Sequence, residues 1–317
     1  MITPFEVIIA VLPVYLLILA GGVLRKLKVI LPEHDAGVMR VVLAVMLPCY
    51  ILDTILGSEV LRKGGAIASA VAIGFSGILI GMFVAMCVGR FMRLEKGSGM
   101  RTFMISAGSQ NFGYTAVPVA EALWGSGALA LLFVHNLGVE AAIWSVGVMC
   151  MSGGKKMQWR RLLNGPMIAV MAGLLLVACG LDDRVNGPFR TAISWIGVGA
   201  FPLAILITGC AMMDMLGEEK PSWRLMTAAC VVRLGIAPLA ILCAAKWLPI
   251  STELKQVLVV QAAMPAAMMP ILIARVYGGR PAVAVQIVIS TTVVSFLTLP
   301  WIISWGVKWL DLSPALP

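Results

Sequence analysis

A ten-residue segment in the middle of an apolar stretch carries polar groups that could bind a solute. The segment is SQNFGYTAVP, residues 109–118. Amide side chains donate and accept hydrogen bonds, and glycine allows close approach to the backbone. Inside a helix, Gly costs about 1 kcal/mol and Pro about 3 kcal/mol relative to Ala. The segment therefore predicts a helix break that exposes main-chain groups to a substrate. Its candidate site residues are Gln110, Asn111, Gly113, Tyr114 and Pro118.

A second apolar stretch is interrupted in a similar way. It reads QAAMPAAMMP over residues 261–270, and its candidate site residues are Gln261, Pro265 and Pro270. A half-helix that follows a break starts with unpaired N–H groups and a partial positive charge, which stabilise an anion. The half-helix before the break ends with unpaired carbonyls. We expect a small anion between the two breaks, held by Asn111, Gln261 and backbone N–H groups.

Polar and ionisable side chains inside apolar stretches form a further set of candidates, because such groups are costly within a bilayer. His135, Asn136 and Glu140 follow one another in FVHNLGVEAAIW, and Arg233 lies within another apolar stretch. They could couple transport to a proton or neutralise the substrate. Internal hydrogen bonds between helices are the alternative role for the first three. For Arg233, the alternative is an ion pair with Asp214 or Glu140.

The composition is that of a polytopic membrane protein. Of the 317 residues, 60% are hydrophobic and 12% are charged, and the mean hydropathy is +0.98. Soluble domains contain about 25% charged residues. We attribute the net charge of +9 to cytoplasmic loops rather than to nucleic-acid binding. The seven cysteines form no CxxC pair, and we expect neither a metal nor another cofactor.

Stretches long enough to cross a bilayer recur ten times along the chain. Ten spans divide into five plus five, so the second half enters the membrane from the opposite side. The sequence thus predicts an all-α fold with an inverted repeat. The repeats are residues 1–150 and 164–317, joined by a linker at 151–163. The spans are 5–24, 37–56, 65–89, 101–124, 126–150, 164–181, 191–215, 223–247, 254–277 and 281–306.

Loop charges predict the orientation. Loops after the odd-numbered spans carry 16 Lys and Arg residues, whereas the other side carries seven. Positively charged loops remain in the cytoplasm. We therefore expect the loop at 152–163 to be cytoplasmic and both termini to be external.

Three segments resemble the auxin efflux carrier family over essentially the whole chain. They are GSQNFGYTAVPVAEALWG, VQAAMPAAMMPILIARVYGG and STTVVSFLTLPWII. The resemblance implies that the broken spans four and nine cross at their prolines, at Pro118 and at either Pro265 or Pro270. It implies a mobile unit of spans 3–5 and 8–10, a homodimeric scaffold of spans 1, 2, 6 and 7, and an elevator-like movement. Bacterial members are associated with malonate, malate and related carboxylates. We expect this chain to lie in a bacterial inner membrane. Many of them carry a Gly/Asn-containing stretch where this chain has AAMM.

The expected function is secondary transport of a small organic anion, with coupling to H⁺ or Na⁺ left open. An anion channel, or a membrane sensor without transport coupling, is the alternative. We expect no enzymatic activity, because the chain contains neither HExxH nor GxSxG. It also lacks the GxxxxGK[ST] pattern needed for direct drive by ATP.

The orientation can be tested by cysteine labelling in a background without native cysteines. Lys156→Cys should resist a membrane-impermeant reagent applied to intact cells, because the loop around it is predicted to be cytoplasmic. Arg184→Cys, on the opposite side, serves as the positive control. Labelling of Lys156→Cys from outside would reverse the predicted topology.

Overall fold

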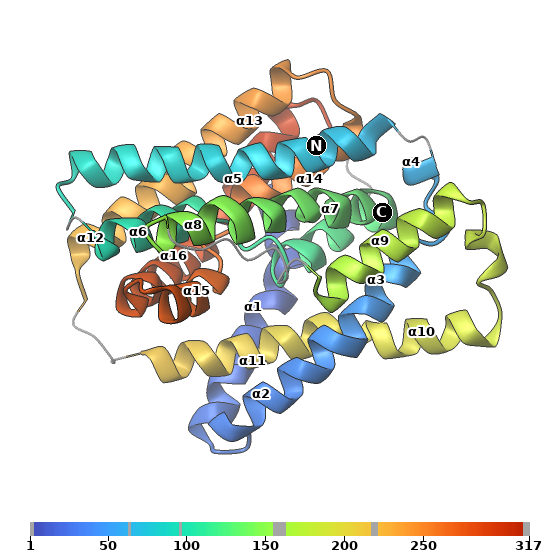
Figure 1. Cartoon of the computed structure of the whole chain (residues 1–317), viewed down its shortest axis with the longest axis horizontal. Helices are drawn as coiled ribbons and strands as arrows, with labels where there is room; N and C mark the ends of the chain where they lie inside the picture. The colour runs from blue at the N-terminus through green and yellow to red at the C-terminus, as the bar shows by residue number, and fades with distance from the viewer. Residues whose placement is uncertain (1–2, 63–64, 95–96, 155–162, 217–220, 313–317) are drawn as a thin grey trace.

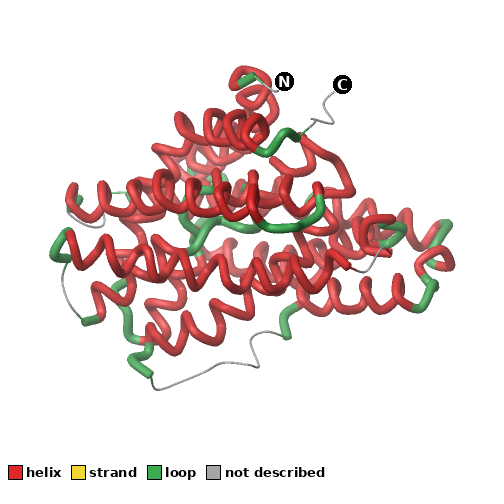
Figure 2. Tube along the Cα trace, turned by 90° about the horizontal axis from the view of Figure 1, so that it is seen from above, coloured by secondary structure: helices red, strands yellow, loops and turns green. Residues whose placement is uncertain are grey.

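The computed structural model describes residues 3–62, 65–94, 97–154, 163–216 and 221–312. These segments are helical and contain no strand, which confirms the all-α prediction for them (Figure 2). Residues 155–162 of the loop predicted to be cytoplasmic lie outside the described part. The elements up to residue 151 are α1 Pro4–Lys26, α2 Pro32–Val41, the π-helical turn η1 Val42–Met46, α3 Leu47–Ile55, α4 Glu59–Arg62, α5 Gly65–Phe91, α6 Ser98–Gly108, α7 Ala116–Ala142, the π-helical turn η2 Ile143–Gly147 and α8 Val148–Met151.

The described residues after 163 also form helices and helical turns. Its elements are α9 Gly165–Ala178, the 3₁₀ turn η4 Asp182–Arg184, α10 Pro188–Val198, α11 Ala200–Met215, α12 Trp223–Cys230, the π-helical segment η5 Val231–Ile236, α13 Ala237–Trp247, α14 Thr252–Ala263, α15 Met269–Tyr277 and α16 Pro281–Trp309.

Seven helical stretches in the described residues are long and apolar enough to cross a membrane, and α9 is a shorter apolar helix. The predicted spans 101–124 and 254–277 are each divided between two helices, so neither appears as one long helix. The count of ten spans stays a prediction. The seven stretches are Pro4–Lys26, Pro32–Ile55, Gly65–Phe91, Ala116–Met151, Pro188–Met215, Trp223–Trp247 and Pro281–Trp309.

The stretch Ala116–Met151 joins the end of predicted span four to predicted span five. Its 36 residues contain one non-helical position, Gly125, with φ 68° and ψ −157°. Only glycine adopts this backbone region readily. Gly125 therefore marks the corner between the two predicted spans.

Glycine contacts bring neighbouring helices close together, as is common in membrane proteins. Gly21 of α1 lies against the backbone of Leu206 in α11, and Gly74 of α5 lies against the carbonyl of His135 in α7. A Cβ at either glycine would collide with main chain. In Figure 1, α13 and α5 occupy the upper edge of the molecule, and α2 and α11 occupy the lower edge. Between them lie α7, α14 and α16, which carry much of the buried core.

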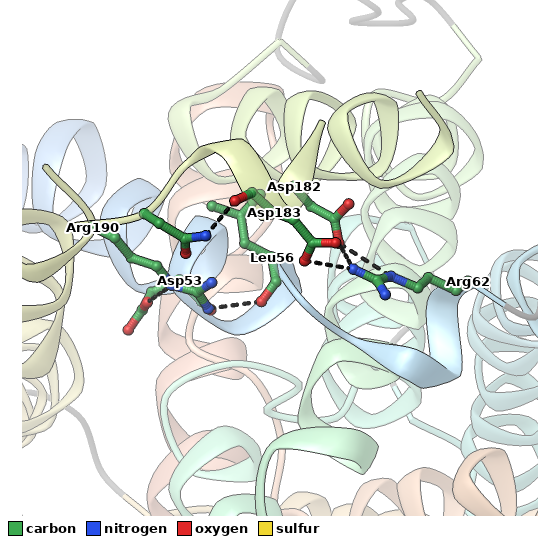
Figure 3. Close-up of polar contacts among 7 residues, drawn as sticks. Asp53, Leu56, Arg62, Asp182, Asp183 and Arg190 are labelled. Carbon is green, nitrogen blue, oxygen red and sulfur yellow. Dashed lines mark hydrogen bonds and ion pairs between the residues drawn. The ribbon is translucent and has the colours of Figure 1, made fainter. Parts of the chain in front are cut away.

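An ionic clamp joins the α3–α4 segment to the η4–α10 segment (Figure 3). Arg62 donates through Nη2 to Asp182 Oδ2 at 2.6 Å and to Asp183 Oδ1 at 2.9 Å. Arg190 donates through Nε to Asp53 Oδ1 at 3.1 Å and through Nη2 to the Leu56 carbonyl at 2.8 Å. The clamp therefore ties two connections from distant parts of the chain.

The clamp predicts a specific acid sensitivity. Hydrogen bonding from Arg62 holds the pKa of Asp182 below its usual value. A lowered folded-state pKa adds stability above the unfolded-state pKa of about 3.9, and this stability is lost as pH falls through the folded-state value. We expect the thermal unfolding midpoint of the wild type to drop below roughly pH 4, and Asp182→Asn to flatten that drop.

Asp183→Asn is the matched control, because its side chain is 76% exposed whereas that of Asp182 is 1% exposed. Unfolding midpoints of detergent-purified protein across an acid pH series provide the measurement. Identical pH profiles for wild type and Asp182→Asn would contradict the assignment of this acid sensitivity to Asp182.

Candidate functional site

Both predicted helix breaks are present at the predicted positions. Helix α6 ends at Gly108 and α7 begins at Ala116, whereas α14 ends at Ala263 and α15 begins at Met269. Residues 109–115 and 264–268 between them are not helical. The chain therefore leaves the helical conformation twice within apolar surroundings.

The two breaks cross and pair with each other as a short antiparallel bridge between Gln110 and Ala266. The N–H of Asn111 donates to the carbonyl of Pro265 at 2.7 Å, and the N–H of Ala267 donates to the carbonyl of Ser109 at 3.0 Å. We call this pairing the crossing. It satisfies backbone groups that the helices release.

The prediction that the chains cross at Pro118 is wrong. Pro118 lies in the first turn of α7, and Pro270 is the second residue of α15. Proline suits a first helical turn, because N–H groups there have no intrahelical acceptor. At the crossing itself, residues with an N–H are needed to pair the two segments. Of the two prolines left open in the second break, Pro265 lies at the crossing, where its carbonyl accepts.

The start of α7 retains unpaired main-chain donors beside the crossing. In the described part of the molecule, the N–H groups of residues 113–116 have no hydrogen-bond acceptor within normal geometry. No atom lies within 4 Å of the position that a Cβ on Gly113 would occupy. Asn111 lies alongside and donates from its side chain to Thr115 Oγ1 at 3.0 Å. This arrangement offers donors and open space to a small anion.

Asn136 of α7 connects both breaks through its side chain. Its Nδ2 donates to the carbonyl of Phe112 at 2.9 Å, and its Oδ1 accepts from Gln261 Nε2 at 3.3 Å. His135 Nδ1 lies 3.4 Å from the same Oδ1. The structure thus brings His135, Asn136 and Gln261 together.

Glu140 lies apart from this group. Its Oε2 accepts from Asn164 Nδ2 at 2.6 Å, and Asn164 caps the start of α9. Residues 136 and 140 share one side of α7, but the Glu140 carboxylate points to α9 while Asn136 points to the breaks. Proton coupling through His135 or Glu140 stays a prediction, and the two side chains have different partners, Asn136 and Asn164.

Arg233 contacts backbone rather than a carboxylate. Its Nε donates to the carbonyl of Met264 at 3.1 Å, and its Nη2 lies 3.4 Å from the carbonyls of Gln261 and Ala262. The suggested pairing with Asp214 or Glu140 is wrong. Asp214 pairs with Arg25 at 3.1 Å, and Glu140 is bonded to Asn164. The carbonyls at the end of α14 are the better partners, because a helix C-terminus attracts a cation.

A cavity of about 110 Å³ lies between α5 and α13. Apolar and small residues of both helices form its walls, and four buried polar side chains line it at the breaks. Gln261 Oε1 is among the buried atoms that have no hydrogen-bond partner. The volume exceeds what one water molecule needs, so the cavity has room for several waters or a small solute. The polar side chains are Gln110, His135, Arg233 and Gln261.

The predicted site residues therefore divide into two groups. Asn111, Gly113 and Tyr114 surround the start of α7, whereas those that line the cavity lie nearer the end of α14. Sequence reasoning missed Thr291, whose Oγ1 accepts from the N–H of Ala266 at 3.1 Å. The run Ser290–Thr292 within an apolar helix was the available signal. No group of His, Cys, Asp or Glu in the described segments could hold a metal ion.

Comparison with known proteins covers nearly the whole chain. A family model described as "Membrane transport protein" matches residues 6–158 and, separately, residues 148–303. The chain is also similar to an uncharacterized transporter of Methanothermobacter thermautotrophicus. The two are 23% identical over 294 residues, which are 92% of this chain and 95% of that protein.

The connecting role of Asn136 can be tested by measuring how a substitution there changes the stability of the protein. Asn136→Ala removes a donor and an acceptor and leaves the carbonyl of Phe112 and the amide of Gln261 without these partners. We expect a loss of roughly 1–3 kcal/mol in the free energy of unfolding. Asn186→Ala is the control, because Asn186 bonds only to the nearby Asp183 carbonyl. Equal thermal unfolding midpoints for Asn136→Ala and Asn186→Ala would contradict the connecting role.

Proposed function

This chain belongs to the membrane transport protein family, in agreement with its resemblance to auxin efflux carriers, and we propose that it is a secondary carrier for a small organic anion of the carboxylate type. The family is one of transporters, which favours transport over catalysis. The relative from Methanothermobacter thermautotrophicus is itself named only as a transporter, so the proposed class of substrate rests on the geometry of the crossing.

The unpaired N–H groups at the start of α7 carry the proposal. Non-helical backbone is tolerated at membrane depth only where it is buried in protein or lines a polar cavity. Residues 113–116 keep four donors unpaired in the described structure, and Gly113 has open space beside it. The N-terminal end of a helix also carries partial positive charge. An anion that accepts these hydrogen bonds would satisfy the donors.

We further propose that the carrier works by elevator-like alternating access within a ten-span, five-plus-five inverted repeat. Spans 3–5 and 8–10 would move against a homodimeric scaffold of spans 1, 2, 6 and 7 in a bacterial inner membrane. Contacts between α1 and α16 would belong to the sliding surface. There, Tyr15 Oη lies 3.4 Å from Ser295 Oγ, and the Tyr15 ring lies against Phe296 at an interplanar angle of 30°, with centroids 3.6 Å apart.

A substitution at Gly113 tests the proposed anion position. Gly113→Val places a branched side chain where no protein atom lies within 4 Å, so the protein should still fold. It should obstruct the donors and weaken apparent affinity for the anion by roughly tenfold, equivalent to about 1.4 kcal/mol. The measurement is counter-exchange of carboxylates, including malonate and malate, by purified protein in liposomes.

Gly37→Val is the matched control, because Gly37 also has no atom within 4 Å of its Cβ position and lies in α2. It should exchange carboxylates as the wild type does. If Gly113→Val and Gly37→Val have equal affinities, the start of α7 is not the anion site. An ohmic current in place of saturable exchange would identify a channel.

A further inference from the structure

Arg233 is a buried cation attached to the end of a broken helix. Its side chain is 1% exposed, and it projects from the π-helical segment η5. Single π-helical turns often occur at functional positions. The guanidinium meets the carbonyls of Gln261, Ala262 and Met264, where α14 stops. These carbonyls have no intrahelical donor, because the helix ends before it can supply one.

The charge of Arg233 is not matched by a carboxylate in the described residues. The ion pairs found there involve Arg25, Arg62, Arg190 and Lys246. A helix C-terminus contributes only about half a negative charge. The end of α14 therefore carries a net positive charge, in the segment whose continuation pairs with residues 109–111 at the crossing.

The geometry of a break does not by itself require an arginine. At the end of α6, Gly81 of α5 packs directly against the backbone of Gly108. No cationic side chain of the described structure donates to the last carbonyls of α6 in the way that Arg233 does at α14. The cation is thus a specific feature of the second break.

In carriers with discontinuous helices, carbonyls at half-helix ends commonly coordinate the coupling Na⁺ or H⁺. In this chain the guanidinium already occupies such carbonyls. We infer that Arg233 is a tethered cation that takes the place of a coupling Na⁺, so that the carrier binds its anion without sodium. This inference rests on the proposed function for its transport consequence, but the occupancy of the carbonyls can be measured independently.

The test uses thermal unfolding of the full-length, detergent-purified chain in sodium chloride and in choline chloride at equal ionic strength. The wild type should unfold at the same temperature in both salts. Arg233→Met, which is neutral but still fills space, should have a lower midpoint in choline, and Na⁺ should raise that midpoint in a saturable way. A ligand that binds only the folded state stabilises it by mass action. Arg224→Met, at an exposed position in α12, is the control and should respond to neither salt.

Arg233→Lys keeps the positive charge without the planar guanidinium. It should have a midpoint between those of wild type and Arg233→Met and should show no saturable response to Na⁺. If Arg233→Met cannot be purified folded, Arg233→Lys decides the question. Failure of Arg233→Lys to fold would show that guanidinium shape rather than charge is required, and would overturn the inference.

Sodium-specific stabilisation of the wild type, or no sodium response in folded Arg233→Met, would also overturn it. Carboxylate exchange by wild-type liposomes in choline should match exchange in sodium. Absence of exchange in both salts would contradict the proposed function. The unfolding results would then decide by themselves whether Arg233 takes the place of Na⁺. Exchange that appears only in sodium would contradict the tethered cation.

Discussion

A chain that leaves the helical conformation inside a membrane must find partners for its own N–H and C=O groups. Water is absent from the bilayer core, and each unsatisfied group there costs several kcal/mol. The two breaks solve this problem jointly. Asn111 and Ala267 donate across the crossing to Pro265 and Ser109, and Thr291 accepts from Ala266. Neither break could be buried in this way without the other, so the crossing fixes how α6, α7, α14 and α15 are arranged.

The two breaks differ in charge, although their backbone groups are satisfied by the same pairing. The end of α14 holds Arg233, whereas the end of α6 holds a glycine contact between α5 and α6. The positive ends of half-helices alone would give a weak preference for anions. An uncompensated guanidinium adds a full charge at a buried position, where electrostatic interactions are less screened than at the surface. The second break therefore adds a buried positive charge to the crossing, carried by Arg233.

The sequence predicts the position of each break well, because Gly, Pro and Asn in an apolar run disfavour a continuous helix locally. It predicts partners poorly. Pro118 and Pro265 are equally compatible with a break, and only the three-dimensional pairing distinguishes a first helical turn from the crossing. The partners of Arg233 are carbonyls, which every residue has, so no pattern identifies them. Glu140 lies in the correct helix for the site, but Asn164, distant in sequence, determines the direction of its carboxylate.

The pattern of hydrogen bonds also bears on how the proposed carrier could move. Opening the crossing would separate the main-chain bonds of Asn111 and Ala267 and release Asn136 from both breaks, so several buried polar groups would lose their partners at once. The contact between Tyr15 of α1 and Ser295 of α16 is a single hydrogen bond at 3.4 Å, beside a tilted contact between the rings of Tyr15 and Phe296. Sliding at this contact exposes few polar groups. Alternating access that carries the crossing as one rigid body is therefore favoured over a mechanism that refolds the breaks in each cycle.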